Sequence, residues 1–304
     1  MIVDHPAAFL RAWRSGNYLA QAPASARAAF LVAPLGFHLA EQSAQDNRYM
    51  RMQSSVDAGA ALVEHAELAR RIGSVVPVVT FPGDSTTPDA VFPNNVYATA
   101  KGRLIIGRMR HEVRQREARR ADIRGFFADV LGYATQDLSD LDGVAELTGA
   151  LVIDRARGIG YCGLSERCDH AGAQAMHAAF GLRLTYCFPL AAGEYHTNVV
   201  LSVLAGRAVV IAADGFADPA DAAAIASAYD PCVLSLSPAQ KSDYAGNCIA
   251  LSDDTVWMSA RAAAALSDTQ RAQLAEWDFR IEAVDLPQIE KAGGSLRCCV
   301  GEIY

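Results

Sequence analysis

Five polar residues recur at a nearly constant interval along the chain, and their types suit nucleophilic catalysis. They are Asn95, Glu146, His196, Asn247 and Cys298, separated by 51, 50, 51 and 51 residues. A cysteine acts as a nucleophile when a neighbour lowers its pKa or takes its proton, and a histidine oriented by a carboxylate can take that proton. If the first polar residue of each repeat points inward, these side chains converge at one centre.

The strongest candidate nucleophile is Cys298, which follows the glycine pair Gly293-Gly294 at the start of an apolar segment. Two glycines allow a tight turn or a close approach to a ligand. A buried cysteine more often serves as a small apolar residue, and we interpret the adjacent Cys299 in that way. The spacing favours Cys298 as the reactive thiol.

Each repeat reads as strand, strand, helix, strand, and a repeat of about 51 residues predicts supersecondary units arranged around an axis. The predicted hairpins pair residues 96–98 with 104–106, 150–153 with 159–162, 199–203 with 208–211, and 248–251 with 255–258. Helical periodicity covers residues 56–72, 108–131, 171–180, 220–229 and 267–276. The last repeat has only one strand, which we expect to begin at Leu296, so we expect the N-terminal strand 29–32 to close the ring. The polar loop 36–52 could cover a site.

Length and composition set the domain organisation. The chain has 304 residues, 51% of them hydrophobic, and a net charge of −7. We expect one α/β catalytic domain over residues 1–304, with residues 1–28 as a polar, Ala-rich lead-in. The acidic balance argues against binding to nucleic acid or to anionic membranes.

Cysteine usage and apolar runs indicate the compartment. The start lacks a secretory leader, and no apolar run approaches the roughly 18 residues that span a bilayer. The seven scattered cysteines are an odd number and fit a reducing cytoplasm. Neither C-x-x-C nor H-E-x-x-H occurs, so no zinc site is expected.

Five ordered motifs resemble the amidinotransferase-like or pentein superfamily, most closely its citrulline-utilising hydrolases, over residues 29–304. The motifs are Phe92-Pro93-Asn94-Asn95, Glu146-x-Thr148-Gly149, Tyr195-His196-Thr197-Asn198, Gly246-Asn247 and Gly293-Gly294-Ser295-Leu296-Arg297-Cys298. The resemblance implies an α/β fold built as a five-bladed propeller with pseudo-fivefold repeats. This expectation agrees with the interval counted above.

The resemblance also implies catalytic roles for three residues. Cys298 corresponds to the nucleophile, His196 to the general acid and base, and Glu146 to the glutamate that contacts the histidine and the substrate nitrogens. Leu147 stands where relatives prefer glycine, and Val96 where many have tryptophan. These departures leave the catalytic residues intact and concern the shape of the pocket.

Further positions correspond to residues that hold the amino-acid end of the substrate. Asp89 matches an aspartate that binds the α-amino group, and Arg114 and Arg155 match arginines that bind the α-carboxylate. The implied partner is therefore a small amino acid. The chemistry requires no metal and no organic cofactor, and homo-oligomer formation stays open.

Two asparagines bear on the substrate. Asn95 and Asn198 stand where arginine-processing relatives carry aspartates that pair with a guanidinium. A buried cation needs anionic partners, whereas an amide suits a neutral ureido group with its own C=O and N–H. We therefore predict hydrolysis of citrulline to ornithine, carbon dioxide and ammonia through a thiocarbamoyl intermediate. An arginine dihydrolase or deiminase, another guanidine-modifying hydrolase, and an amidinotransferase are the alternatives.

Overall fold

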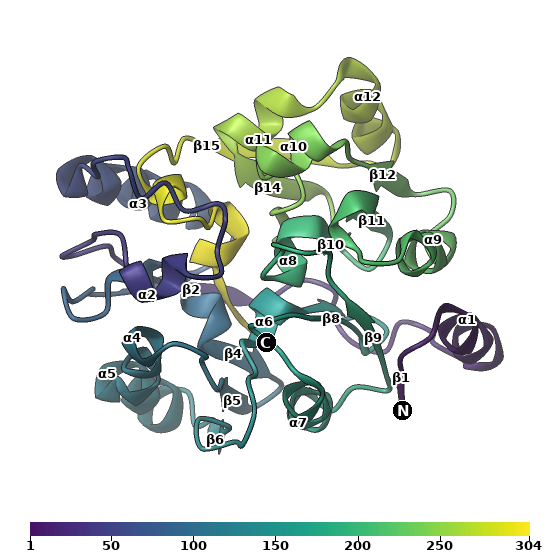
Figure 1. The fold of residues 1–304 in the computed structure, drawn as a ribbon, viewed down its shortest axis with the longest axis horizontal. Helices are drawn as coiled ribbons and strands as arrows, with labels where there is room; N and C mark the ends of the chain where they lie inside the picture. The colour runs from purple at the N-terminus through teal and green to yellow at the C-terminus, as the bar shows by residue number, and fades with distance from the viewer.

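The computed structural model describes residues 1–304, which form a mixed α/β fold of five small sheets around a common centre (Figure 1). Four sheets repeat one plan, in which an antiparallel hairpin is followed by a third, parallel strand. Their strands are β4 (Tyr97–Ala100), β5 (Arg103–Ile106) and β6 (Ala134–Asp137); β7 (Leu151–Asp154), β8 (Ile159–Leu164) and β9 (Leu184–Pro189); β10 (Leu201–Leu204), β11 (Ala208–Ile211) and β12 (Val233–Ser235); and β13 (Ile249–Ala250), β14 (Thr255–Ser259) and β15 (Arg280–Val284).

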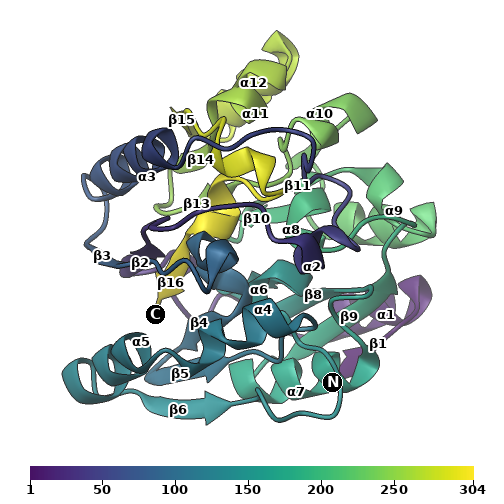
Figure 2. The ribbon, with the colours of Figure 1, turned by 60° about the vertical axis from the view of Figure 1, so that its left-hand side comes forward.

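The fifth sheet joins the two ends of the chain. Strand β16 (Gly301–Ile303) pairs antiparallel with β2 (Ala28–Val32), which pairs parallel with β3 (Val78–Phe81). Figure 2 shows β16 beside β2, and β16 also contacts β4 of the next sheet. The expectation that an N-terminal strand completes the last repeat is confirmed.

Helices lie at the periphery and short helical turns lie at the centre (Figure 1). The outer helices α3, α7, α9 and α12 pack on strands of the sheets, which buries their apolar faces. The helices are α1 (Pro6–Ser15), α2 (Glu41–Ala44), α3 (Ala58–Ile72), α4 (Glu112–Gln115), α5 (Ala121–Gly125), α6 (Leu147–Ala150), α7 (His170–Phe180), α8 (Thr197–Val200), α9 (Pro219–Ser227), α10 (Pro238–Ser242), α11 (Ala260–Ala265) and α12 (Asp268–Glu276).

The N-terminal lead-in is part of the second sheet. Strand β1 (Ile2–Val3) pairs parallel with β9 as a fourth strand. Helix α1 buries Phe9, whose ring stacks on Tyr186 at a centroid distance of 4.7 Å. Residues 1–15 are thus anchored by backbone pairing and by apolar burial.

Two predicted elements were wrong. The helix expected over residues 108–131 is broken into α4, α5 and short turns. It is interrupted because the backbone of Arg120 is extended, with a ψ of 112°. The strand expected from Leu296 begins only at Gly301. Residues Leu296–Cys299 form a 3-10 turn, so Cys298 lies before the strand and not in it.

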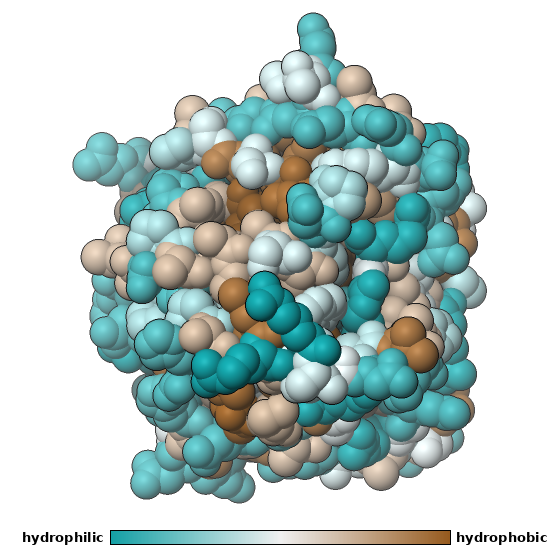
Figure 3. Space-filling model, turned by 90° about the vertical axis from the view of Figure 1, so that its right-hand side faces the viewer, coloured by the Kyte–Doolittle hydropathy of each residue, from teal (hydrophilic) through white to brown (hydrophobic).

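The molecular surface is mainly polar. On the face shown in Figure 3, apolar residues form small patches that are separated by hydrophilic ones. No helix has the length and apolar character needed to cross a membrane. All seven cysteines are free thiols.

Candidate active site

Short helical turns carry the recurring polar residues to the centre of the molecule. Asn95 ends the 3-10 turn Pro93–Asn95, Glu146 directly precedes α6, His196 directly precedes α8, and Cys298 lies in the turn Leu296–Cys299. The turn Pro93–Asn95 contacts both α6 and Leu296–Cys299, and α6 contacts α8. The predicted convergence of these side chains is confirmed.

Cys298 lines a buried cavity of about 290 Å³ together with His196, Asn95 and Asp89. Its Sγ accepts hydrogen bonds from Asn247 Nδ2 at 3.3 Å and from Asn198 Nδ2 at 3.7 Å. Burial raises the pKa of the Cys298 thiol, although these amides and the nearby Arg297 act in the opposite direction. The thiol is therefore protonated at neutral pH and needs a base to become a nucleophile.

His196 has the geometry of such a base. Its Nε2 lies 2.8 Å from Glu146 Oε2, and its Nδ1 is buried without a partner. Because an ionised carboxylate only accepts hydrogen bonds, Nε2 carries the hydrogen and Nδ1 is left as an acceptor. Burial lowers the pKa of His196 despite the neighbouring Glu146, so the ring is neutral and can take a proton.

Glu146 depends on Arg167, a residue that sequence reasoning missed. Arg167 Nη1 donates to the two carboxylate oxygens of Glu146 at 3.1 and 3.3 Å, and Arg167 Nε donates to Asp46 at 2.8 Å. Burial alone would raise the pKa of Glu146, but the charge of Arg167 and the bond to His196 outweigh it and hold that pKa well below its usual range. Glu146 is thus a charged, oriented partner of His196.

Two of the asparagines present amide oxygens that have no partner within the chain. Asn95 Oδ1 and Asn247 Oδ1 are both buried and unpaired. Asn198 does not line the cavity, but its Nδ2 bridges Thr148 O, at 3.2 Å, and Cys298 Sγ. Unpaired buried acceptors near a thiol provide sites for N–H groups of a ligand.

Gly149 allows this close packing. A Cβ atom at this position would lie 2.5 Å from Asn95 Oδ1 and 2.8 Å from the His196 ring. No side chain fits there, so glycine is required by the close approach of α6 to both residues. Leu147, two residues earlier, has a φ of 22°, which explains physically why glycine suits that position in relatives.

Asp89 and Arg114 line the same cavity, as the resemblance implied. Asp89 Oδ2 accepts a hydrogen bond from Ser43, whereas its Oδ1 is buried without a partner. Arg114 binds Glu117 through Nε at 3.0 Å and Nη2 at 2.9 Å, and its Nη1 has no partner within the chain. Each of these two lining residues therefore keeps one polar atom without a partner in the chain, a carboxylate oxygen of Asp89 and a guanidinium nitrogen of Arg114.

Arg155 is a correction, because it does not line this cavity. Its Nη1 donates to Thr99 O at 3.0 Å, and its guanidinium lies 4.2 Å from the ring centroid of Tyr304. Strand β7 separates it from Glu146, and four residues of strand advance the chain by about 13 Å. A fixed offset from Glu146 therefore does not bring Arg155 to the catalytic residues.

The polar loop 36–52 supplies cavity residues that the sequence did not identify individually. Ser43 of α2 and Asn47 line the cavity, and both are buried. Asp46 binds Arg167, and it also lies 3.0 Å from His111 Nε2. The loop thus packs against the site, and only its polar content could have indicated this.

Comparisons with known proteins agree with this geometry. A sequence model of the family "N,N dimethylarginine dimethylhydrolase, eukaryotic" matches residues 33–304. No curated protein matches the chain by sequence.

Solved structures share the fold. One similar structure is the N-terminal domain of ArgZ, solved with its substrate; ArgZ is an arginine dihydrolase of the ornithine–ammonia cycle in cyanobacteria. Its sequence is 18% identical to this chain, and the TM-score is 0.78. The match covers 91% of this chain and 97% of that domain. A dimethylarginine dimethylaminohydrolase with an S-methyl-L-thiocitrulline adduct is 20% identical with a TM-score of 0.70, and the match covers 91% of this chain and 99% of the other. At these identities the likeness establishes the fold.

Proposed function

Because the chain belongs to the N,N dimethylarginine dimethylhydrolase family, within the pentein superfamily, we propose that it is a cysteine hydrolase that cleaves C–N bonds in the side chain of an arginine-type amino acid. The observation that carries the proposal is the cavity that Cys298 and His196 line together, with His196 Nε2 2.8 Å from Glu146 Oε2. We also infer that the five sheets are the blades of a five-bladed α/β propeller, since neighbouring sheets contact one another through β7, β10 and β13.

The proposed reaction begins when His196 Nδ1 takes the proton of the Cys298 thiol. The thiolate attacks the central carbon of the substrate's guanidino or ureido group, while Asn95 accepts an N–H of that group. His196 returns the proton to the departing nitrogen, and the C–N bond breaks to leave a covalent adduct on Cys298. His196 then takes a proton from water, whose oxygen attacks the adduct and releases the thiolate. Glu146 stabilises the protonated imidazole in both steps.

The amino-acid end of the substrate is held by Asp89 and Arg114 in this proposal. The unpaired Asp89 Oδ1 suits an α-ammonium group, and the free Arg114 Nη1 suits an α-carboxylate. Glu117 already neutralises Arg114 in part, which holds the guanidinium in place before the substrate binds.

Arginine is the first substrate that we propose, because the matching family and the solved arginine dihydrolase both act on guanidino compounds by their names. Attack on arginine and loss of one ammonia yields citrulline. A second attack, on the ureido carbon, yields ornithine and carbamate, which decays to carbon dioxide and ammonia. The same residues can perform both hydrolyses, and each consumes one water.

Citrulline, which the sequence favoured, is the second candidate, and one observation supports it. Arg167 already balances the charge of Glu146, and the positions facing the thiol are the amides of Asn95, Asn198 and Asn247. The unpaired carboxylate oxygen of this cavity, Asp89 Oδ1, is assigned here to the α-ammonium group, which leaves amide oxygens for the reacting group. A neutral ureido group could bind these free amide oxygens without an anionic partner.

The experiment is to incubate the purified protein with arginine or with citrulline and to measure ammonia, citrulline and ornithine, with Cys298→Ala as the control. Products from arginine support the first candidate, and ornithine from citrulline alone supports the second. A new guanidino product when glycine or lysine is added with arginine identifies an amidinotransferase. If the Cys298→Ala variant is as active as the native chain, the proposal is wrong.

A further inference from the structure

A large hollow lies away from the Cys298 cavity and is lined by positive charge. It measures about 1720 Å³ and lies among the β4–β5 turn, the β7–β8 turn, the end of α7 and residues 21–27. No aspartate or glutamate lines it, although the chain carries a net charge of −7. We call it the basic hollow, after its six cationic residues Arg27, Lys101, Arg103, Arg155, Arg157 and Arg183.

Five of these cations have no anionic partner. Only Arg157 forms an ion pair, with Asp154 at 2.8 Å. Lys101 and Arg103 make no side-chain hydrogen bond within the chain, and Arg155 and Arg183 donate only to backbone carbonyls. Like charges collected in a concave surface repel one another and raise the local concentration of anions. The unpaired cations are therefore available to an anion that enters the hollow.

Regular backbone elements carry Lys101 and Arg103, and aromatic rings hold the side chain of Arg155. Lys101 stands in the tight turn before β5, where Gly102 has a φ of 69°, and Arg103 is the first residue of β5. Arg155 is fixed between two rings, with its guanidinium 4.2 Å from the Tyr304 centroid and 5.2 Å from that of Phe180. Cations positioned in advance lose little conformational entropy when a ligand binds.

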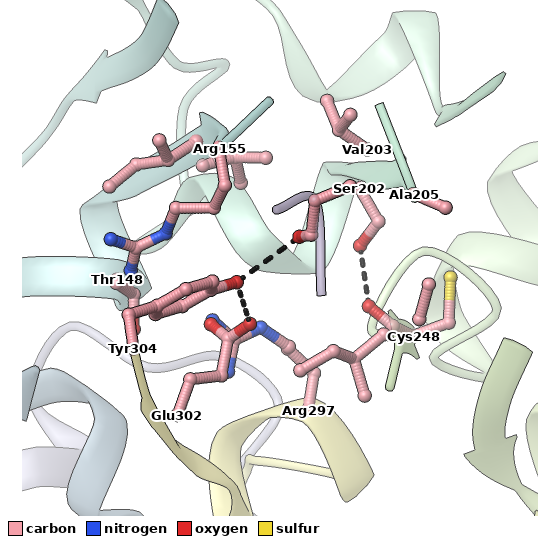
Figure 4. A pocket seen from close by; sticks show the side chains of 14 residues that line it. Thr148, Arg155, Ser202, Val203, Ala205, Cys248, Arg297, Glu302 and Tyr304 are labelled. Atoms are coloured by element: carbon pink, nitrogen blue, oxygen red, sulfur yellow. Dashed lines mark hydrogen bonds and ion pairs between the residues drawn. The ribbon is translucent and has the colours of Figure 1, made fainter. Parts of the chain in front are cut away.

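The hollow is bounded on its inner side at Arg155 and Tyr304. Both residues also line an inner cavity of about 470 Å³, shown in Figure 4, where Arg297 Nη2 binds Glu302 at 2.8 Å. Tyr304 also donates to Glu302, at 2.8 Å. Because Glu302 repels anions, we expect a ligand to stop at Arg155. The inner cavity shares no lining residue with the Cys298 cavity, so the basic hollow is distinct from the catalytic site.

We propose that the basic hollow binds a multiply charged phosphate ligand. Arginine forks bind phosphate oxygens in pairs, and six cations line the hollow, so a chain of phosphoryl groups can contact several of them at once. Arg155 covers the Tyr304 ring, and Arg27 lies over Tyr133 at 5.8 Å, so the rings are occupied by cations. The hollow therefore recognises phosphate charge and does not stack a nucleobase.

The test is calorimetric titration of the full chain with inorganic triphosphate and, separately, with ATP, both without metal. The double variant Lys101→Glu, Arg103→Glu should weaken binding at least about tenfold, because two cations of the hollow become anions that repel phosphate. The control is Arg70→Glu, Arg280→Glu, which makes the same charge change at exposed residues outside the hollow. It should change the affinity less than about twofold.

The two arms distinguish the source of the phosphate. Equal affinities for triphosphate and ATP support recognition of phosphate alone, and tighter binding of ATP would contradict the inference that the hollow does not bind a nucleobase. The proposal is overturned if neither binds at low salt, if the Lys101/Arg103 variant binds as the native chain does, or if only RNA or polyglutamate binds. Native-like melting of the variant excludes misfolding. Cys298→Ala should bind the ligand unchanged, so the result is independent of the proposed hydrolase activity.

Discussion

Replacing Arg167 by methionine should uncouple Glu146 from the catalytic histidine. Arg167 is only 2% exposed, and its Nη1 donates to both oxygens of Glu146, which is fully buried. Methionine fills a similar volume without the charge. Glu146 would then be a buried carboxylate whose remaining side-chain partner is His196, and its pKa would rise.

The size of this effect follows from the burial of the pair. Breaking a buried ion pair by removing one partner costs about 3–5 kcal/mol. The entropy of unfolding is about 2.1 cal/mol/K per residue, or about 0.6 kcal/mol/K for 304 residues, so the midpoint of thermal unfolding should fall by about 5–8 °C. Loss of a residue that orients a catalytic side chain should lower kcat/KM by about 10–100-fold.

The assays are calorimetric melting and the pH profile of kcat/KM with whichever substrate turns over. Because Arg167 now holds the pKa of Glu146 low, Arg167→Met should move the acid limb of the profile to higher pH, and Arg167→Lys should restore part of the shift. Arg110→Met is the matched control: Arg110 also pairs with Asp46, at 3.0 Å, but is 39% exposed, and only its backbone N–H contacts Glu146. An unchanged acid limb in Arg167→Met, or an equal shift in the control, would refute the reasoning.

Three further changes test other parts of the structure. Gly149→Ala places a methyl group 2.5 Å from Asn95 Oδ1 and 2.8 Å from the His196 ring. We therefore expect kcat/KM to fall by at least about tenfold and the free energy of unfolding to fall by about 1–3 kcal/mol. Native-like kinetics would contradict the tight packing. Asn95→Asp adds a carboxylate to the cavity, which favours a cationic guanidinium. The ratio of kcat/KM for arginine to kcat/KM for citrulline should therefore rise by about tenfold. A fall in this ratio would show that Asn95 does not face the reacting group. Burial lowers the pKa of His65 to about 4, whereas an unfolded histidine titrates near 6.5. The contribution of neutral His65 to stability is therefore present above pH 6.5 and is lost as the pH falls toward 4. In urea unfolding, the free energy of unfolding of the native chain should fall by about 2–3 kcal/mol more between pH 7.5 and 4.5 than that of His65→Leu. Equal losses in the two proteins would exclude this assignment.

The parts of the fold that depend on local pattern could be predicted from the sequence. The hairpin turns at Lys101-Gly102 and Arg157-Gly158 lie between the strands predicted to pair, and both glycines have positive φ. The constant interval predicted that Asn95 and Cys298 lie near one another, and both line one cavity. The prediction works because each repeat carries the equivalent residue to the centre of the molecule. Local propensity did not show that Cys298 lies in a 3-10 turn, since its apolar neighbours fit a strand equally well.

The parts of the site that depend on long-range contacts could not be predicted. Arg167 lies outside the repeated positions, and its role follows from Asp46, which is 121 residues away in the chain. Arg155 has the right residue type and offset but stands at the far end of β7. Only the three-dimensional structure distinguishes an arginine that neutralises Glu146 from one that lies over Tyr304.

The most direct test of the central claim is intact-protein mass spectrometry of the chain quenched in acid during turnover of arginine or citrulline. The account predicts a covalent adduct of the substrate's guanidino or ureido carbon on the peptide that contains Cys298, together with release of ammonia or ornithine. The Cys298→Ala variant should show neither. Release of products at the native rate from Cys298→Ala, or an adduct that maps only to another cysteine, would contradict the claim that Cys298 is the nucleophile.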